Sequence, residues 1–82
     1  MKTYTILKTH RGKTREVTGT IPELIEYFGY TLECGASWSG HRGCRKVNTQ
    51  PKTIKSLVTA LNNAVHNTQG SCWDPDYYEY VD

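Results

Sequence analysis

The chain has 82 residues and a formal net charge of +2, with ten Lys and Arg residues against eight Asp and Glu residues. A chain of this length forms one domain with a thin core, because it buries only about 60% of its unfolded surface. The low charge disfavours a protein that coats duplex nucleic acid, and no segment is long and apolar enough to span a bilayer.

Two strands and a helix are expected in the first part of the chain. Alternation of apolar and polar residues predicts strands over residues 2–9 and 14–19, joined by a glycine-containing turn. Thr20 and Glu23 have the spacing of a capping box, and Pro22 is tolerated in a first helical turn. We therefore expect a helix that ends or kinks at Gly29. The next residues, 30–33, either continue it or form a short strand.

The clearest helix signal lies further along the chain. Pro51 is expected to be its first residue, with Gln50 as the N-cap. One apolar stripe then follows at helical spacing, made of Ile54, Leu57, Val58, Leu61 and Val65. Alternation over residues 77–81 predicts a last strand.

The predicted order is β-β-α-loop-α-β, which describes a single α+β domain over residues 1–82. The simplest arrangement is a small antiparallel sheet, made of a β-hairpin and a C-terminal strand, with two helices on one face. Three strands leave exposed sheet edges, so we expect a homodimer or a higher homo-oligomer.

Charge is distributed unevenly along the chain. Residues 1–60 carry ten basic and four acidic residues (+6), whereas residues 61–82 carry four acidic residues and no Lys or Arg (−4). One interpretation is an ordinary soluble surface. The other is a basic binding face with an acidic, tyrosine-rich tail that contacts another molecule or subunit.

The cellular compartment is inferred from the N-terminus and the cysteines. The first residues lack the apolar run of a signal peptide. Three cysteines at irregular spacing fit reduced thiols better than a disulfide framework. We therefore expect a cytoplasmic protein.

The stretch from Cys34 to Lys55 is the most informative for function. It holds three glycines and five basic residues, and no carboxylate occurs between Glu33 and Asp74. We expect a glycine-rich basic loop that leads into a helix N-terminus, an arrangement that attracts anions. The candidate ligand-binding residues are Trp38, Arg42, Arg45, Lys46, Lys52, Thr53 and Lys55.

Other interpretations of this stretch stay open. It has no P-loop motif, and a solvated flexible loop would explain its composition equally well. Trp38 either closes the small core or offers a stacking surface for a base or a partner protein.

Metal binding and catalysis have weaker support. The possible soft ligands Cys34, His41, Cys44, His66 and Cys72 lack the C-x2-C spacing that is usual in structural zinc sites. Carboxylates are few and scattered, and no spacing forces a cysteine and a histidine together. We expect no metal, no cofactor and no enzymatic activity.

Two segments resemble small uncharacterised proteins encoded by tailed bacteriophages. These are YTLECGASW, from Tyr30, and KVNTQPKTIKSLVTALNNA, from Lys46. The resemblance covers about residues 27–67 and carries no established catalytic residues. These small proteins are similar in size and context to phage proteins that blunt bacterial immunity, such as anti-CRISPRs and sponges that sequester cyclic nucleotide signals. This similarity is an analogy and does not rest on a shared motif.

The resemblance and the basic stretch together imply a non-enzymatic inhibitor of host defence that acts in the bacterial cytosol. Its expected ligand is a phosphorylated, nucleotide-like signal. One alternative is an inhibitor that binds a host effector protein through Trp38, Tyr77, Tyr78 and the acidic tail. The other alternative is a small nucleic-acid-binding module, whose affinity for nucleic acid would fall steeply as the salt concentration rises.

Overall fold

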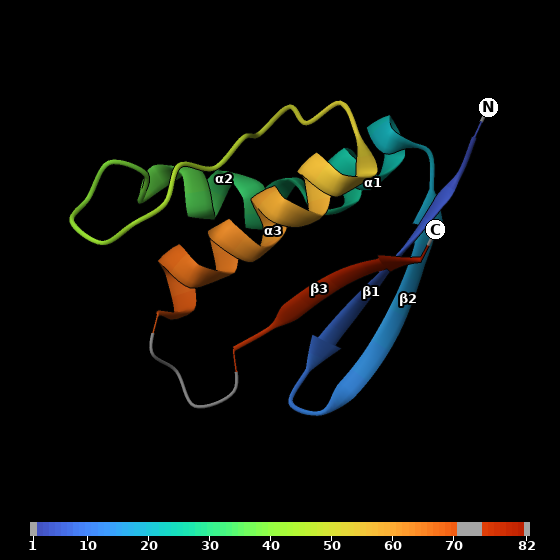
Figure 1. Ribbon diagram of the computed structural model, residues 1–82, viewed down its shortest axis with the longest axis horizontal. Helices are drawn as coiled ribbons and strands as arrows, with labels where there is room; N and C mark the ends of the chain where they lie inside the picture. The colour runs from blue at the N-terminus through green and yellow to red at the C-terminus, as the bar shows by residue number, and fades with distance from the viewer. Residues whose placement is uncertain (1, 71–74, 82) are drawn as a thin grey trace.

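A computed structural model describes residues 2–70 and 75–81 of the chain. It has two layers, with three helices on one face of a three-stranded sheet (Figure 1). The elements in chain order are β1 (Tyr4–His10), β2 (Lys13–Gly19), α1 (Ile21–Tyr27), α2 (Gly29–Ser37), α3 (Ile54–Gln69) and β3 (Tyr77–Val81). The predicted α+β class is confirmed.

The sheet has the order β2-β1-β3, and both pairs are antiparallel. Arg11 and Gly12 form the hairpin turn with φ values of 50° and 77°. Two central residues with positive φ are what a two-residue turn needs to match the twist of its strands. Ile6 lies opposite Val17 on one side and Tyr80 on the other, which places these three on the face that the helices cover. The predicted hairpin and C-terminal strand are both confirmed.

The capping box at the start of α1 is also confirmed. The Glu23 backbone N–H donates to Thr20 Oγ1 at 3.4 Å, and the Thr20 N–H donates to Glu23 Oε1 at 2.9 Å. Hydrogen bonds from the backbone and the hydroxyl of Thr20 stabilise the carboxylate, so the pKa of Glu23 is lowered.

The segment after α1 is helical for longer than expected. Phe28 is both the C-cap of α1 and the N-cap of α2, which runs from Gly29 to Ser37. The described residues therefore form three helices rather than two, with a joint at Gly29, where a kink was predicted. Cys34 and Gly35 belong to α2, so the loop begins at Trp38 rather than at Cys34.

The predicted start of α3 was wrong by three residues. Thr53, not Gln50, is the N-cap, and its hydroxyl accepts the Ser56 N–H at 3.1 Å. The Gln50 N–H donates to the side chain of Asn48 at 2.9 Å, so Gln50 belongs to a local turn instead. The predicted apolar stripe is confirmed, because all five of its residues are buried.

Tyr78 anchors β3 in the core. Its ring packs edge-on against Phe28, with the centroids 5.6 Å apart. Burial, with a smaller contribution from the charge of Asp76, raises the pKa of Tyr78 to about 12, although a hydrogen bond with Thr31 opposes the shift. The phenol is therefore neutral at physiological pH.

The helices α2 and α3 approach each other closely at Gly35 of α2. A Cβ added there would overlap the Cβ and Cα atoms of Ala64 in α3. Gly35 thus allows the two helices to pack backbone against side chain. We expected Gly35 to be a loop glycine that lets the backbone approach a ligand. Its position inside α2 gives it a packing role instead.

This packing predicts different outcomes for two glycine substitutions. Gly35→Ala would force α2 and α3 apart and should lower the free energy of unfolding by about 1–3 kcal/mol. Gly29→Ala is the matched control, because its added Cβ would meet no atom within 4 Å. That control should be neutral or slightly stabilising, since alanine is the better helix former. Urea unfolding measures both, and equal stability of the two variants would contradict the packing account.

Candidate functional site

Asn67 of α3 fixes the loop that joins α2 to α3. Its Oδ1 accepts the Arg45 N–H at 2.8 Å, and its Nδ2 donates to the Arg45 carbonyl at 2.7 Å. Nδ2 also donates to the Gly35 carbonyl at 3.1 Å. One amide side chain thus ties α2, the loop and α3 together, which argues against a freely flexible loop.

Further hydrogen bonds hold the loop on both sides of Arg45. Asn63 Nδ2 donates to the Lys46 carbonyl at 3.4 Å, and His66 Nε2 lies 3.1 Å from the Gly43 carbonyl. Ser39 Oγ donates to the Arg45 carbonyl and accepts the Val47 N–H, both at 3.2 Å. The Val47 side chain is buried in the core. The loop is therefore attached both by its backbone and by an apolar side chain.

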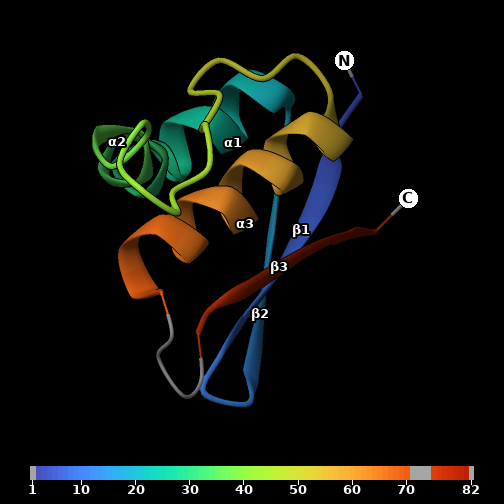
Figure 2. The same cartoon turned by 60° about the vertical axis from the view of Figure 1, so that its left-hand side comes forward.

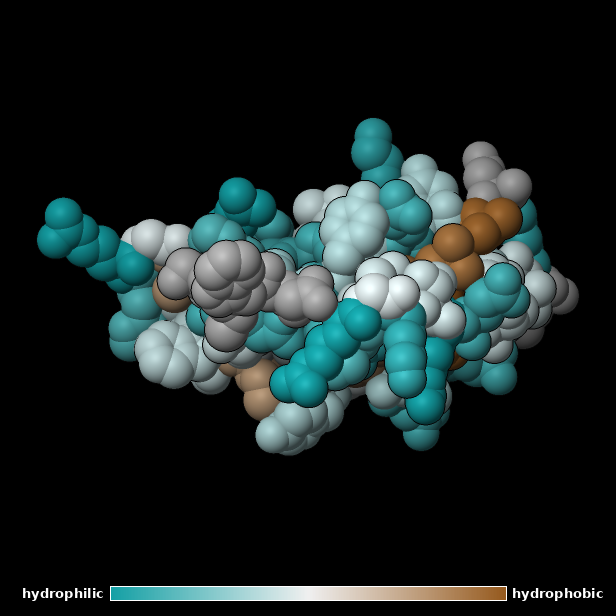
Figure 3. Space-filling model, turned by 90° about the horizontal axis from the view of Figure 1, so that it is seen from below, coloured by the Kyte–Doolittle hydropathy of each residue, from teal (hydrophilic) through white to brown (hydrophobic). Residues whose placement is uncertain are grey.

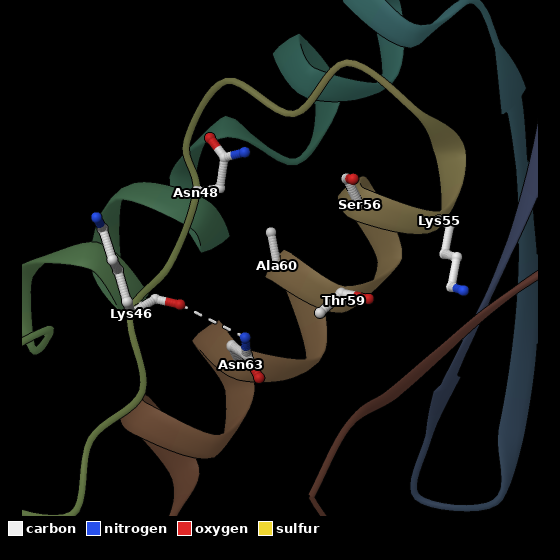
Figure 4. A pocket seen from close by; sticks show the side chains of 7 residues that line it. All are labelled: Lys46, Asn48, Lys55, Ser56, Thr59, Ala60 and Asn63. Carbon is white, nitrogen blue, oxygen red and sulfur yellow. Dashed lines mark hydrogen bonds between the residues drawn. The ribbon is translucent and has the colours of Figure 1, made fainter.

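A shallow depression of about 340 Å³ lies between this loop and α3 (Figure 4). In that view Lys46 and Lys55 lie at opposite ends, with small polar side chains and Ala60 between them. The complete lining is Lys46, Asn48, Lys55, Ser56, Thr59, Ala60 and Asn63. No lining side chain is acidic, so the depression combines positive charge at its ends with neutral hydrogen-bonding groups.

The structure brings together only some of the candidate binding residues. Lys46 and Lys55 line the depression, and Arg45 reaches its edge through a 3.5 Å hydrogen bond from Nη1 to Asn63 Oδ1. Arg42 and Trp38 do not line the depression and belong to the part of the loop that follows α2, and Lys52 is exposed before α3 begins.

The Trp38 side chain does not close the core. Its residue is 50% exposed, and its ring centroid lies 5.4 Å from that of His41. The two rings form a small aromatic cluster where α2 passes into the loop. Trp38 therefore remains available to a ligand or a partner.

Thr53 is occupied by the helix that it caps. Its hydroxyl donates to Ser56 Oγ at 2.8 Å while accepting the Ser56 N–H. These bonds satisfy one of the unpaired amides at the helix start. Thr53 consequently contributes structure at this end of α3 rather than a free donor.

Five lining residues were not predicted as site residues: Asn48, Ser56, Thr59, Ala60 and Asn63. A signal for part of this set is present in the sequence. Ser56, Thr59 and Asn63 recur at i, i+3 and i+7, which places them on one face of a helix. A polar stripe beside the apolar one thus marks the face of α3 that the loop borders.

The described residues contain no group of three or more His, Cys, Asp or Glu side chains that could hold a metal ion. Cys34 and Cys44 are free, half-buried thiols. Cys72 lies outside the residues that the structure describes. Within that described part, no helix has both the length and the apolar character that crossing a membrane requires.

Comparison of the chain with protein-family models, curated proteins and solved structures gave no match. The functional argument therefore depends on the geometry described above.

The role of Asn67 can be tested directly. Asn67→Ala removes three hydrogen bonds, each worth about 1 kcal/mol, and should lower the free energy of unfolding by about 2–3 kcal/mol. Amide exchange at Arg45 should accelerate because its N–H loses its partner. Asn48→Ala is the control, since Asn48 accepts one local bond from Gln50. Unchanged exchange at Arg45 in the Asn67 variant would contradict the attachment of the loop.

Proposed function

We propose that this chain is a non-enzymatic binding protein that sequesters a phosphorylated, nucleotide-like signal. The observation that carries the proposal is the depression beside α3, where a loop lysine and a helix lysine flank small polar side chains. Lys46 and Lys55 approach it from separate segments of the chain. Two separated cations suit a ligand with two phosphate groups.

The chemistry of the lining favours binding over catalysis. Lys46 and Lys55 supply point charges for phosphate oxygens, and Arg45 at the edge offers a planar set of donors. The Asn48 and Asn63 amides and the Ser56 and Thr59 hydroxyls can bond to sugar or base atoms. The lining contributes no carboxylate, histidine or cysteine. Such a set offers charge and hydrogen bonds without the usual acids, bases and nucleophiles.

The biological setting comes from the resemblance to phage-encoded proteins. A phage protein that sequesters a phosphorylated signal in the bacterial cytosol would block an immune pathway that depends on that signal. A homodimer fits this role, because a second copy over a shallow depression would enclose more of the ligand. Trp38 or a tyrosine from either copy would then stack on the base.

A second candidate function is inhibition by binding a host effector protein. The exposed Trp38 beside His41 supports it, because exposed tryptophans often anchor protein interfaces. Tyr77, Tyr80 and Val81 of β3 add exposed apolar surface on an edge strand, whereas Tyr78, which was also predicted as a contact residue, is buried in the core. On this account the depression has no ligand, and the loop region around Trp38 makes the contact.

The sequestration proposal predicts that the native protein carries or takes up a nucleotide. Denaturing the purified protein should release one that mass spectrometry identifies, and calorimetry should then measure binding of cyclic dinucleotides. The double variant Lys46→Gln, Lys55→Gln should bind at least about tenfold more weakly, because it loses two charged contacts.

The matched control for this experiment is Lys2→Gln, Arg11→Gln, which removes the same charge far from the depression. It should leave the affinity unchanged. Equal weakening by both variants would contradict a specific site. Stable capture of a host protein that Trp38→Ala abolishes, together with no nucleotide binding, would favour the protein-binding function instead.

A further inference from the structure

A second group of basic side chains lies at the hairpin end of the sheet. The register pairs Lys8 with Arg15 and His10 with Lys13 across β1 and β2. Directly opposite residues of an antiparallel pair share a face, and the alternation from buried Ile6 places these four on the helix-facing side. The hairpin extends beyond the described helices (Figures 1 and 2).

Asp76 enters the same region from the segment before β3. Its Oδ2 lies 3.7 Å from Lys8 Nζ, and its Oδ1 accepts a hydrogen bond from His10 Nδ1. The side chain is only 10% exposed, and the Asp76 N–H donates to Gln69 Oε1 at 2.7 Å. The hairpin and the segment before β3, which are distant in sequence, therefore meet here.

The carboxylate of Asp76 is held in its ionised form. Burial alone would raise its pKa, but hydrogen bonding by the His10 and Gln69 side chains, with the charges of His10 and Lys8, outweighs burial. The net effect lowers the pKa of Asp76. Because the carboxylate accepts from Nδ1, that nitrogen carries a proton and Nε2 of His10 is left for another partner.

Positive charge exceeds negative charge in this region. Lys8, Lys13 and Arg15 contribute three cations against the single carboxylate of Asp76, which leaves +2 before any charge on His10 is counted. Within residues 2–70 and 75–81, Lys13 and Arg15 form no ion pair. These side chains line a hollow of about 320 Å³ with His10 and Asp76. Seen from the hairpin end, the surface carries long hydrophilic side chains (Figure 3).

We propose that this hollow binds a compact anion that carries phosphate groups, such as a pyrophosphate moiety. The Arg15 guanidinium can bind one phosphate through two parallel hydrogen bonds, while Lys13 and Lys8 supply point charges. With Nδ1 of His10 bonded to Asp76, Nε2 is the ring nitrogen that would donate to the anion, and it does so when the imidazole is protonated. Asp76 holds Lys8 and His10 in place before the ligand arrives, which reduces the cost of ordering these two side chains on binding.

This site is separate from the depression beside α3 and does not depend on the function proposed for it. None of its lining residues occurs in the lining of the other. A hollow of this size favours a small phosphorylated molecule over the backbone of a nucleic acid, which would follow a longer basic track.

Isothermal titration calorimetry with inorganic pyrophosphate at low ionic strength tests the proposal. The wild-type protein should bind, and Lys13→Gln and Arg15→Gln should each weaken binding about tenfold. The double variant Lys2→Gln, Arg11→Gln is the charge-matched control for the double variant Lys13→Gln, Arg15→Gln. It should retain the wild-type affinity, because both of its residues lie outside the hollow. Circular dichroism checks that every variant is folded.

Three outcomes would overturn the proposal. One is no binding of pyrophosphate by the wild-type protein. Another is equal weakening in the control pair, which would indicate a general charge effect. The third is binding of a single-stranded oligonucleotide, lost in the Lys13 and Arg15 variants, without binding of pyrophosphate, which would identify a polymer site.

Discussion

The arrangement of this domain depends on α3 and on the asparagines that it carries. Its apolar stripe closes the core, while Asn62 and Asn67 hold the segments on either side. Asn62 accepts the Tyr78 N–H at 2.9 Å and donates to the Tyr78 carbonyl at 3.0 Å, which fixes β3. Asn67 holds the loop through both backbone groups of Arg45. One helix thus positions the edge strand and the loop together.

These amide bonds explain how a small domain can present charge in a fixed place. Backbone groups of a loop need partners, and here side chains of α3 provide several of them. Arg45 and Lys46 are consequently attached at the backbone while their side chains stay exposed. A binding site assembled before its ligand arrives avoids part of the ordering cost, which matters most where few contacts are available.

Features encoded locally were predictable from the sequence. The Thr20–Glu23 capping box, the apolar stripe of α3 and the hairpin each depend on residues a few positions apart. The start of α3 was misplaced because Pro51 suits a first helical turn, whereas the Asn48 side chain stabilises a turn and Thr53 caps the helix.

Features that depend on distant residues were not predictable in the same way. Gly35 looks like a loop glycine until Ala64 is placed against it. Asp76 joins Lys8 and His10 only because β3 pairs with β1, and no local pattern connects residues so far apart in the chain. The candidate site was predicted in part for the same reason. Its basic residues were visible, but the contribution of the polar face of α3 required the loop to be placed beside it.

The most direct test of the central claim, that a loop held by α3 forms a binding site with it, is amide chemical-shift mapping by NMR. Titration with a cyclic dinucleotide should shift Lys46, Ser56 and Thr59 together, with Arg45 at the edge, because all border one depression. Shifts confined to the region of Trp38, or no shifts at saturating ligand, would contradict the account.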